Sequence, residues 1–432
     1  MTAERLYQLD VTLRRTRAEV TGVSPRPDCS GDFQVTFDRT VFFSEEGGQH
    51  CDTGRVIHIN DPRNRGKNSP ESYPIVHVND VDNELIHIIH VDNPEKMLLT
   101  PGDTVEMEID WDNRFDNMQR HAGEHILSGA VYRLFGGANR GFHMGEDAIT
   151  IDIDFRCEDS VRNPDGSPRY ERLTWEMAMA AEQEANRVIM SDAPIRTDYF
   201  STREEAEKMP LRKKLKIDRD ISVVTIGDPD NPADCCACCG THPSSAGQIG
   251  ILKIYRIEPN KGMSRIFFEC GGRALRHYRD QFNTLYDIGT ALSSGIGELP
   301  AKFAAYEEKN RETLETLHRL KRRLTEAETE ELRRVMKPRL VRHYTDLSVD
   351  DLFQIAKRIS PDCPDRIALV ADPACTVVLV SDGRPGTECG ACVKELASGF
   401  GARGGGKKES ARAIFPDRAS LDRFLNAFTS EE

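Results

Sequence analysis

Two short patterns of potential metal ligands most strongly constrain how this chain can fold. His121 and His125 lie four residues apart, and Cys238 and His242, much later in the chain, have the same spacing. Residues four apart on a helix project from one face, so His121 and His125 could hold one cation. Zinc favours imidazole nitrogen and thiolate sulfur in tetrahedral geometry. The two pairs together predict a single zinc site, which requires two distant segments to meet in the folded chain.

Each pair also has an alternative interpretation. A histidine pair at this spacing is as often an ordinary core or surface pair as a metal site. Cysteines cluster at Cys235, Cys236, Cys238 and Cys239, and such clustering in a reducing compartment indicates metal binding. The four cysteines could form a zinc knot of their own. Adjacent cysteines point in different directions, however, which disfavours their convergence on one ion.

The first pair also belongs to a competing signature. His121-Ala-Gly-Glu124-His125 spells H-x-x-E-H, the pattern of zinc metallopeptidases in which the glutamate acts as general base. This alternative requires a third ligand, usually a glutamate on a later helix, and the segment 173–190 could supply one. It does not account for Cys238 and His242.

Length and composition indicate a multidomain cytoplasmic protein. The chain has 432 residues, more than a single core usually supports, and 38% of them are hydrophobic while 30% are charged. No apolar stretch is long enough to span a membrane, and the first twenty residues carry charges where a secretory signal would be apolar. The net charge of -13 argues against nonspecific coating of nucleic acid. Any nucleic-acid site must therefore be local.

Hydrophobic periodicity predicts an α+β multidomain fold. Five short strands bounded by turn residues predict an N-terminal β-barrel, a helix is expected from Trp111 to Gly136, and later strands suit a mainly antiparallel sheet. The predicted domains are a β-barrel over 1–110, a zinc-binding α+β domain over 111–290, a helical connector over 291–342 and an α/β domain over 343–432.

The connector has one apolar seam on a highly charged helix. Leu317, Leu320, Leu324 and Ala327 recur at alternating three- and four-residue steps between about Pro300 and Met336. Fewer than three clean heptads are present, so the pattern leaves two alternatives open. The helix either packs on its own chain as a linker or forms a coiled coil with a second copy.

Two glycine-rich segments are candidate ligand sites. Gly47 and Gly48, followed by Gln49, suit a tight turn that a bulky ligand could approach, although an ordinary β-turn is the favoured local interpretation. The run from Gly401 to Lys407 satisfies the G-x-x-x-x-G-K pattern of ATP-binding loops. Lys408 follows where a serine or threonine would hold magnesium, which disfavours nucleotide hydrolysis. A glycine loop beside Arg403, Lys407 and Lys408 could instead bind RNA phosphates.

Four motifs occur in the order found in one known family: TVFFSEEGGQHCDTG, MQRHAGEHILSGA, CCGTHPSSAGQIG and FECGGRAL. Over roughly residues 1–290 the chain resembles the alanyl-tRNA editing protein (AlaX) family, which is similar to the editing domain of alanyl-tRNA synthetase. The terminal GARGGGKKESARA resembles the glycine-rich motif of the synthetase's C-terminal domain, as in the long form of the family.

The resemblance implies an aminoacyl-tRNA hydrolase, a carboxylic ester hydrolase acting in trans. Its substrate would be alanine-accepting tRNA wrongly charged with serine, with glycine as a second candidate. His121, His125, Cys238 and His242 match the family's Zn²⁺ positions. Thr40 matches the threonine that senses the serine hydroxyl and Gln49 the glutamine of the glycine motif, so both are predicted catalytic residues.

The resemblance also implies a tRNA contact in the last domain, and the predicted tRNA-binding residues there are Arg403, Gly404, Gly405, Gly406 and Lys407. A homodimer through the connector helix or the C-terminal domain is a further expected partner, and no membrane contact is expected. A non-enzymatic alternative, a tRNA-binding protein with structural zinc, stays open beside the metallopeptidase.

Overall fold

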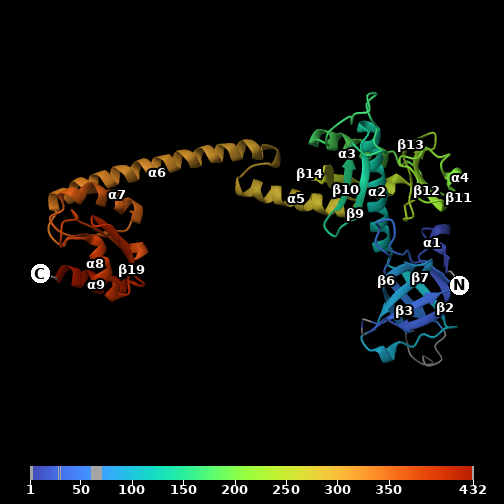
Figure 1. Ribbon diagram of the computed structural model, residues 1–432, viewed down its shortest axis with the longest axis horizontal. Coiled ribbons are helices and arrows are strands. Elements are labelled where there is room, and N and C mark those ends of the chain that lie inside the picture. Colours follow the sequence, from blue (N-terminus) through green and yellow to red (C-terminus); the bar gives the residue numbers. More distant parts are fainter. Residues whose placement is uncertain (1–2, 28, 30, 60–70, 431–432) are drawn as a thin grey trace. The chain divides into compact units, whose positions relative to one another are not determined.

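The computed structural model describes residues 3–27, 29, 31–59 and 71–430. The chain divides into two compact units, Met1–Thr284 and Leu285–Glu432. The α+β class and the N-terminal β-barrel that the sequence predicts are both present (Figure 1). The finer division into four domains stays a prediction. No helix in the described part of the chain is long and apolar enough to cross a membrane.

The first unit begins with a closed six-stranded barrel in which neighbouring strands are antiparallel. Its strand order is β2-β3-β7-β6-β5-β8, with bounds β2 (Arg15–Pro25), β3 (Asp32–Phe37), β5 (Gly54–His58), β6 (Ser72–Val81), β7 (Glu84–His90) and β8 (Thr104–Ile109). The strand β8, absent from the sequence prediction, closes the barrel between β2 and β5. Its residues Val105, Met107 and Ile109 alternate inward and are buried.

One strand prediction in the barrel is wrong in extent. The segment 32–43 reads as a single apolar strand, but β3 ends at Phe37 and a two-residue strand, β4 (Arg39–Thr40), follows. The strand β4 leaves the barrel and pairs in parallel with β1 (Glu4–Arg5), which precedes the short helix α1 (Leu6–Leu9). The glycine-rich segment therefore begins at the edge of the barrel and not inside one of its strands.

The second half of this unit is built around a long helix, α2 (Trp111–Phe135). Asp110 caps its start by accepting hydrogen bonds from the backbone of Asp112 and Asn113, and Gly136 ends it in a left-handed conformation with φ of 78°. The helix thus has the predicted bounds. A four-stranded antiparallel sheet packs against it in the order β14-β15-β10-β9, with bounds β9 (Ala138–Met144), β10 (Ile149–Asp154), β14 (Leu252–Asn260) and β15 (Met263–Cys270).

A second, three-stranded sheet lies on the other side of α2. It consists of β11 (Ile195–Thr202), β12 (Arg219–Asp228) and β13 (Asn231–Ala237), and it carries the short helix α4 (Arg203–Ala206). The helix α3 (Trp175–Met190) packs beside α2, and Thr174 caps its start. The cysteine cluster is divided, because Cys235 and Cys236 lie on β13 whereas Cys238 and Cys239 lie in the following loop.

Two glycines allow α2 to approach both sheets closely. A Cβ atom at Gly123 would lie 2.1 Å from Cys270 Sγ on β15, and one at Gly129 would lie 2.3 Å from the carbonyl oxygen of Ala233 on β13. Any larger side chain would therefore push the helix away from a neighbouring strand. The close fit sets the distance between α2 and the loop that follows β13.

Two helices that follow carry apolar residues on their exposed surfaces. The helix α5 (Gly271–Ala291), which the sequence did not predict, spans the border between the two units. The helix α6 (Leu299–Val335) corresponds to the predicted connector. Its C-terminal end packs on its own chain through the buried Leu332, whereas Leu317, Leu320 and Leu324 are exposed.

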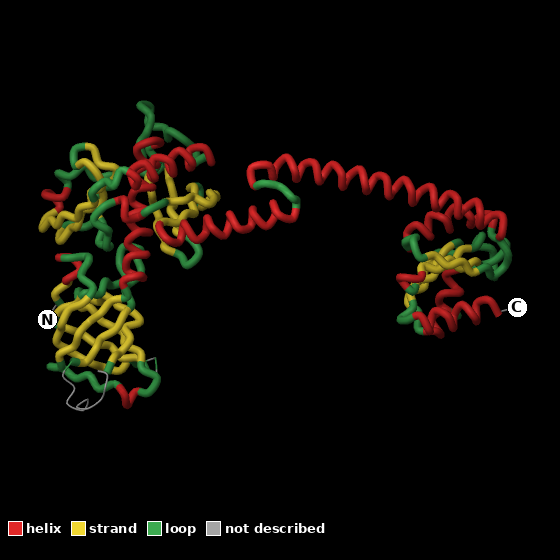
Figure 2. Tube along the Cα trace, turned by 180° about the vertical axis from the view of Figure 1, so that it is seen from behind, coloured by secondary structure: helices red, strands yellow, loops and turns green. Residues whose placement is uncertain are grey.

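The rest of the second unit is a five-stranded sheet with helices on both faces (Figure 2). Its order is β16-β17-β18-β20-β19, with bounds β16 (Val341–Tyr344), β17 (Ile367–Ala371), β18 (Thr376–Val380), β19 (Arg403–Gly406) and β20 (Ser410–Ile414). The helix α7 (Val349–Ile359) covers one face, while α8 (Cys389–Glu395) and α9 (Arg418–Ser430) cover the other. This is the predicted α/β arrangement.

The predicted glycine loop is instead the edge strand β19, paired antiparallel with β20. Glycine suits this strand because a Cβ atom at Gly404 would lie 1.9 Å from the carbonyl oxygen of Arg412. An ATP-binding loop requires a strand before it and a helix after it. Here a 3-10 turn precedes and a strand follows, so the ATP-binding pattern has no structural support. Arg403, Lys407 and Lys408 are exposed.

Candidate metal centre

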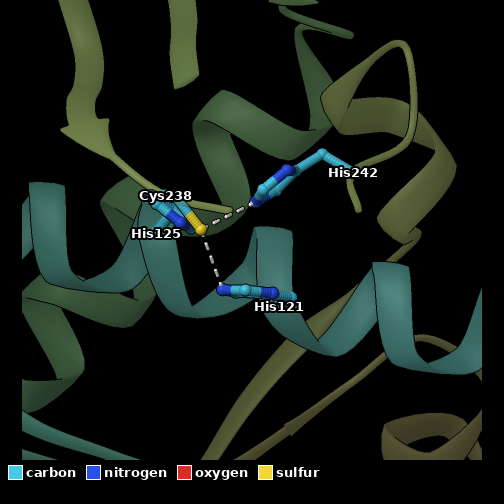
Figure 3. A group of neighbouring side chains, drawn as sticks. All are labelled: His121, His125, Cys238 and His242. Carbon is cyan, nitrogen blue, oxygen red and sulfur yellow. Dashed lines mark hydrogen bonds between the residues drawn. The ribbon is translucent and has the colours of Figure 1, made fainter. Parts of the chain in front are cut away.

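The four predicted metal ligands come together in the first unit (Figure 3). His121 and His125 project from one face of α2, while Cys238 and His242 come from the loop after β13. One ligand atom from each residue lies within 4.8 Å of all the others. The sulfur of Cys238 is 3.3 Å from Nε2 of His121 and 3.8 Å from Nε2 of His242. All three histidines are buried.

The outer nitrogen of His121 is held by the glycine-rich segment. Nδ1 of His121 lies 2.8 Å from Oε1 of Gln49, which can only accept a hydrogen bond, so Nδ1 is the donor and Nε2 is directed at Cys238. Gln49 is itself fixed, because its amide nitrogen donates to Oγ1 of Thr241 at 2.7 Å and its oxygen accepts from the Thr241 backbone at 3.1 Å. Gln49 thus positions a ligand in this structure.

The outer nitrogen of His125 is held by a buried ion pair. Nδ1 of His125 lies 2.8 Å from Oδ2 of Asp234 on β13, and Asp234 accepts hydrogen bonds from Arg212 at 2.5 and 3.2 Å. Burial would raise the pKa of the Asp234 carboxyl, but Arg212 and His125 lower it to about 2. The carboxylate is therefore charged and orients the His125 ring through Nδ1, so that Nε2 is directed at the other members of the group. Neither Asp234 nor Arg212 was predicted, because both lie outside the ligand spacings.

The electrostatics of Cys238 favour the thiolate. Burial alone would raise the pKa of this thiol, but His121, His125 and His242 hold it well below its ordinary value. The backbone N–H of Gly240 also donates to the sulfur at 3.4 Å. A thiolate and three imidazoles, two of them oriented by outer acceptors, are a donor set that Zn²⁺ takes. The residues present therefore fit this ion.

The alternative ligand sets are not assembled among the described residues. Of the four clustered cysteines, only Cys238 joins the group. The metallopeptidase alternative needs a carboxylate from α3, but none belongs to the group. Glu182 instead binds Lys253, and Glu184 binds Arg133 and Arg187.

A cavity of about 210 Å³ is lined by three of the four residues, His121, His125 and Cys238. Glu124, Asn139, Arg140, Phe142 and Lys213 are among its lining residues. Oε1 of Glu124 accepts hydrogen bonds from Ser128 and Asn139, both at 2.6 Å, and its second oxygen lies 4.0 Å from Nε2 of His125. Burial raises the pKa of Glu124, but His125, Arg212 and Lys213 together bring it below its ordinary value. The cavity wall therefore carries a carboxylate.

Sequence reasoning missed four of these lining residues, which are Asn139, Arg140, Phe142 and Lys213. Asn139 lies on β9, a strand that the apolar pattern does not reveal. Lys213 belongs to the basic run Arg212-Lys213-Lys214, which could have been recognised in the sequence as a candidate phosphate-binding segment. For this cavity, the basic run would have been a better sequence signal than the weak strand pattern around Asn139.

Thr40, the predicted serine sensor, lies on β4 and contacts the barrel strand β7. Its side chain is buried, its hydroxyl lies 2.8 Å from Nε2 of His87, and the hydroxyl oxygen accepts from the Phe42 backbone at 3.0 Å. Among the described residues that line the cavity, Thr40 is absent. Its role in sensing serine stays a prediction.

Comparisons with known proteins agree with the motif resemblance. Residues 221–267 match the family model described as "Threonyl and Alanyl tRNA synthetase second additional domain". The chain is 27% identical over 422 residues to the alanyl-tRNA editing protein AlaX-L of Pyrococcus horikoshii. This alignment covers 95% of this chain and 94% of that protein. The resemblance to the long form of the editing family is therefore confirmed.

Alanine–tRNA ligases are similar over a smaller share of their own length. The ligase of Pyrococcus abyssi is 28% identical over 423 residues, and that of Pyrobaculum calidifontis is 27% identical over 439 residues. These alignments cover 95% and 96% of this chain but 42% of each ligase. The chain thus spans less than half the length of the ligases that it matches.

Proposed function

We propose that this chain is an aminoacyl-tRNA hydrolase of the alanyl-tRNA editing type, which removes serine wrongly attached to alanine-accepting tRNA. One observation carries the proposal. Three imidazoles and a thiolate converge beside a cavity, in a chain similar to AlaX-L over nearly its whole length. Glycine is the second candidate amino acid. The activity belongs in the cytoplasm, where charged tRNA is used.

The proposed reaction is the hydrolysis of an ester. Water adds to the ester carbonyl carbon, the bond from that carbon to the ribose oxygen breaks, and the ribose oxygen takes a proton. A zinc ion held by His121, His125, Cys238 and His242 would orient the aminoacyl end or polarise the water. Four protein ligands complete a tetrahedral shell, so orientation of the substrate is the simpler role.

The remaining chemistry belongs to the cavity wall. The carboxylate of Glu124 is suited to pair with the α-ammonium group of the aminoacyl ester, because opposite charges attract strongly where water is displaced. Arg140 and Lys213, which line the same cavity, are suited to the nearby tRNA phosphate. We also propose that Thr40, on β4, senses the serine hydroxyl.

We place the principal tRNA contact of the second unit at the exposed Arg403 and Lys407, with Gly404, Gly405 and Gly406 between them. Because β19 is an edge strand, its glycine backbone leaves room for a phosphate to approach the neighbouring cations. We also propose that the exposed seam of α6 joins two copies of the chain.

Two substitutions test the hydrolase against the metallopeptidase alternative. Cys238→Ala should lower bound zinc and abolish release of serine from seryl-tRNA, because the ion loses its thiolate. Glu124→Gln keeps a side chain that can accept from Ser128 and Asn139, so zinc should stay bound and hydrolysis should fall by less than about tenfold, ~1.4 kcal/mol. Cys29→Ala, at an exposed cysteine of the barrel, is the control.

The opposite pattern would overturn the proposal. If Glu124→Gln eliminates activity while Cys238→Ala binds as many equivalents of zinc as wild type, the glutamate is a general base and the H-x-x-E-H interpretation holds. A chain that binds tRNA but releases no serine would instead be the non-catalytic zinc protein.

A further inference from the structure

A second group of potential metal ligands lies in the barrel, apart from the four already described. Ligand atoms of Glu45, Cys51 and His77 all lie within 4.8 Å of one another. Cys51 is buried, whereas the side chain of His77 is 39% exposed and that of Glu45 is 53% exposed. The proposed hydrolysis uses none of the three. A thiol, an imidazole and a carboxylate thus converge at a place that solvent can reach.

The geometry around Cys51 repeats the geometry around Cys238. The sulfur of Cys51 lies 3.2 Å from Nδ1 of His77, and the sulfur of Cys238 lies 3.3 Å from Nε2 of His121. Each sulfur also receives one backbone N–H at 3.4 Å, from Val78 in the barrel and from Gly240 in the first group. One imidazole nitrogen and one backbone N–H therefore contact each sulfur at matching distances, and Cys238 has His242 in addition.

The outer nitrogens of the two histidines are held in the same way. Nε2 of His77 lies 2.8 Å from the amide oxygen of Asn79, just as Nδ1 of His121 lies 2.8 Å from the amide oxygen of Gln49. An amide oxygen only accepts, so in both cases the outer nitrogen donates to it while the inner nitrogen faces the cysteine sulfur. The carboxylate of Glu45 lies 3.9 Å from the same Nε2 of His77. Amide or carboxylate partners of this kind orient histidine ligands in metal sites.

The backbone brings the three residues together from separate segments. The N–H of Glu45 donates to the carbonyl oxygen of Val78 at 3.1 Å, and the N–H of Val78 donates to Cys51. Both contacts tie the loop between β4 and β5 to β6 beside His77. Glu45, Cys51 and His77 also line one cavity of about 480 Å³, which has room for water or a small ligand next to them.

We propose that Glu45, Cys51 and His77 form a second metal site, which takes Zn²⁺ or another thiophilic divalent cation. With three protein ligands and an adjacent cavity, the site keeps a coordination position open to water or a small molecule. Burial raises the pKa of the Cys51 thiol to about 11, so cation uptake releases a proton. This site has fewer ligands than the first, and they are more exposed, so it should bind the cation with lower affinity. The proposal does not depend on the editing activity.

Metal stoichiometry of the full-length protein tests this site. Metal-free protein would be titrated with Co²⁺, whose thiolate charge-transfer absorption reports cysteine ligation, and bound zinc would be counted by mass spectrometry. Wild type should reach two equivalents. Cys51→Ser and His77→Gln should each reach one, while Cys238→Ala should lose the other. His90→Gln, an exposed histidine of the same barrel, is the matched control and should keep two.

Circular dichroism would verify that each variant is folded. If Cys51→Ser does not fold, His77→Gln still tests the site, because the His77 side chain is partly exposed and its replacement leaves the core unchanged. Saturation of wild type at one equivalent would overturn the proposal. So would two equivalents in folded His77→Gln and Cys51→Ser. In either case Cys51 and His77 form only a thiol–imidazole hydrogen bond.

Discussion

At the scale of single residues, the metal group depends on two acceptors that are not ligands. Gln49 and Asp234 come from different elements, yet each fixes which nitrogen of a histidine faces Cys238. Partners of this kind commonly control metal affinity by one to two orders of magnitude. The glycine-rich segment therefore contributes to the centre through Gln49, whose side chain is buried against His121.

Ligand spacing predicted the four members of the centre but not their surroundings. His121 with His125, and Cys238 with His242, are recognisable because a four-residue step has a physical meaning. Asp234 has no such local pattern, since it reaches His125 only after β13 packs on α2. The location of Thr40 was also beyond sequence reasoning, because its contact with His87 joins β4, which is not a barrel strand, to β7 of the barrel.

His87 provides a residue-scale prediction about stability. Burial lowers its pKa from an ordinary value of about 6.5 to about 4, so below pH 6.5 the unfolded chain binds a proton that the folded chain excludes. This histidine should therefore reduce the free energy of unfolding by about 2 kcal/mol between pH 7 and pH 5. In His87→Gln that contribution should vanish, because glutamine does not titrate but can still form a hydrogen bond with the Thr40 hydroxyl.

The measurement is urea unfolding of both proteins at pH 7 and pH 5, followed by circular dichroism. The difference between the two proteins isolates His87 from the other histidines. Equal losses of stability in wild type and His87→Gln would show that His87 is protonated in the folded chain and would contradict its burial as a neutral side chain.

At the scale of elements, helical periodicity with end caps was a better guide than the alternation of short strands. The helix α2 has clear apolar spacing with a cap at each end, and it was predicted with the correct bounds. The strand β8 was overlooked although Val105, Met107 and Ile109 alternate regularly with polar residues, whereas β9 was missed because Arg140 and Gly141 interrupt its apolar residues. The glycine run was mistaken for a loop, since glycine favours loops locally but here allows close pairing of β19 with β20.

The apolar seam of α6 leads to a prediction about assembly. Leu317, Leu320 and Leu324 are between 41% and 54% exposed, and burying them in a second copy would be favourable. The full-length protein should therefore be a dimer in solution. Leu317→Glu combined with Leu320→Glu should shift it to a monomer, because like charges would meet in the seam.

Light scattering coupled to gel filtration would measure the mass of both proteins. Arg322→Glu is the control, since residue 322 is exposed but lies two positions from Leu320 and Leu324 and so faces elsewhere. A wild-type protein that elutes as a monomer at all concentrations would show that the seam is simply an exposed face of the helix.

At the scale of the whole molecule, charge restricts how tRNA can bind. The net charge of -13 disfavours nonspecific contact, so binding must rely on a few local cations such as Lys213, Arg403 and Lys407. Affinity for tRNA should fall as salt rises. Alanine at Arg403, Lys407 and Lys408 together should weaken binding and also flatten the salt dependence, because each lost phosphate contact releases about one counterion fewer.

Filter binding over a range of potassium chloride concentrations would measure both effects. A triple variant with glutamine at Lys337, Lys357 and Lys394 removes the same number of charges elsewhere in the second unit and serves as the control. Salt-independent binding, or an equal loss in the control, would contradict the local contact at β19.

The most direct test of the editing activity compares one tRNA charged with different amino acids. Alanine-accepting tRNA carrying serine, glycine or alanine would be incubated with the full-length protein, and the release of each amino acid would be followed over time. The proposed function predicts rapid loss of serine while alanine stays attached, with glycine showing how far the specificity extends. Retention of serine at every enzyme concentration, or release of alanine at the same rate, would contradict it.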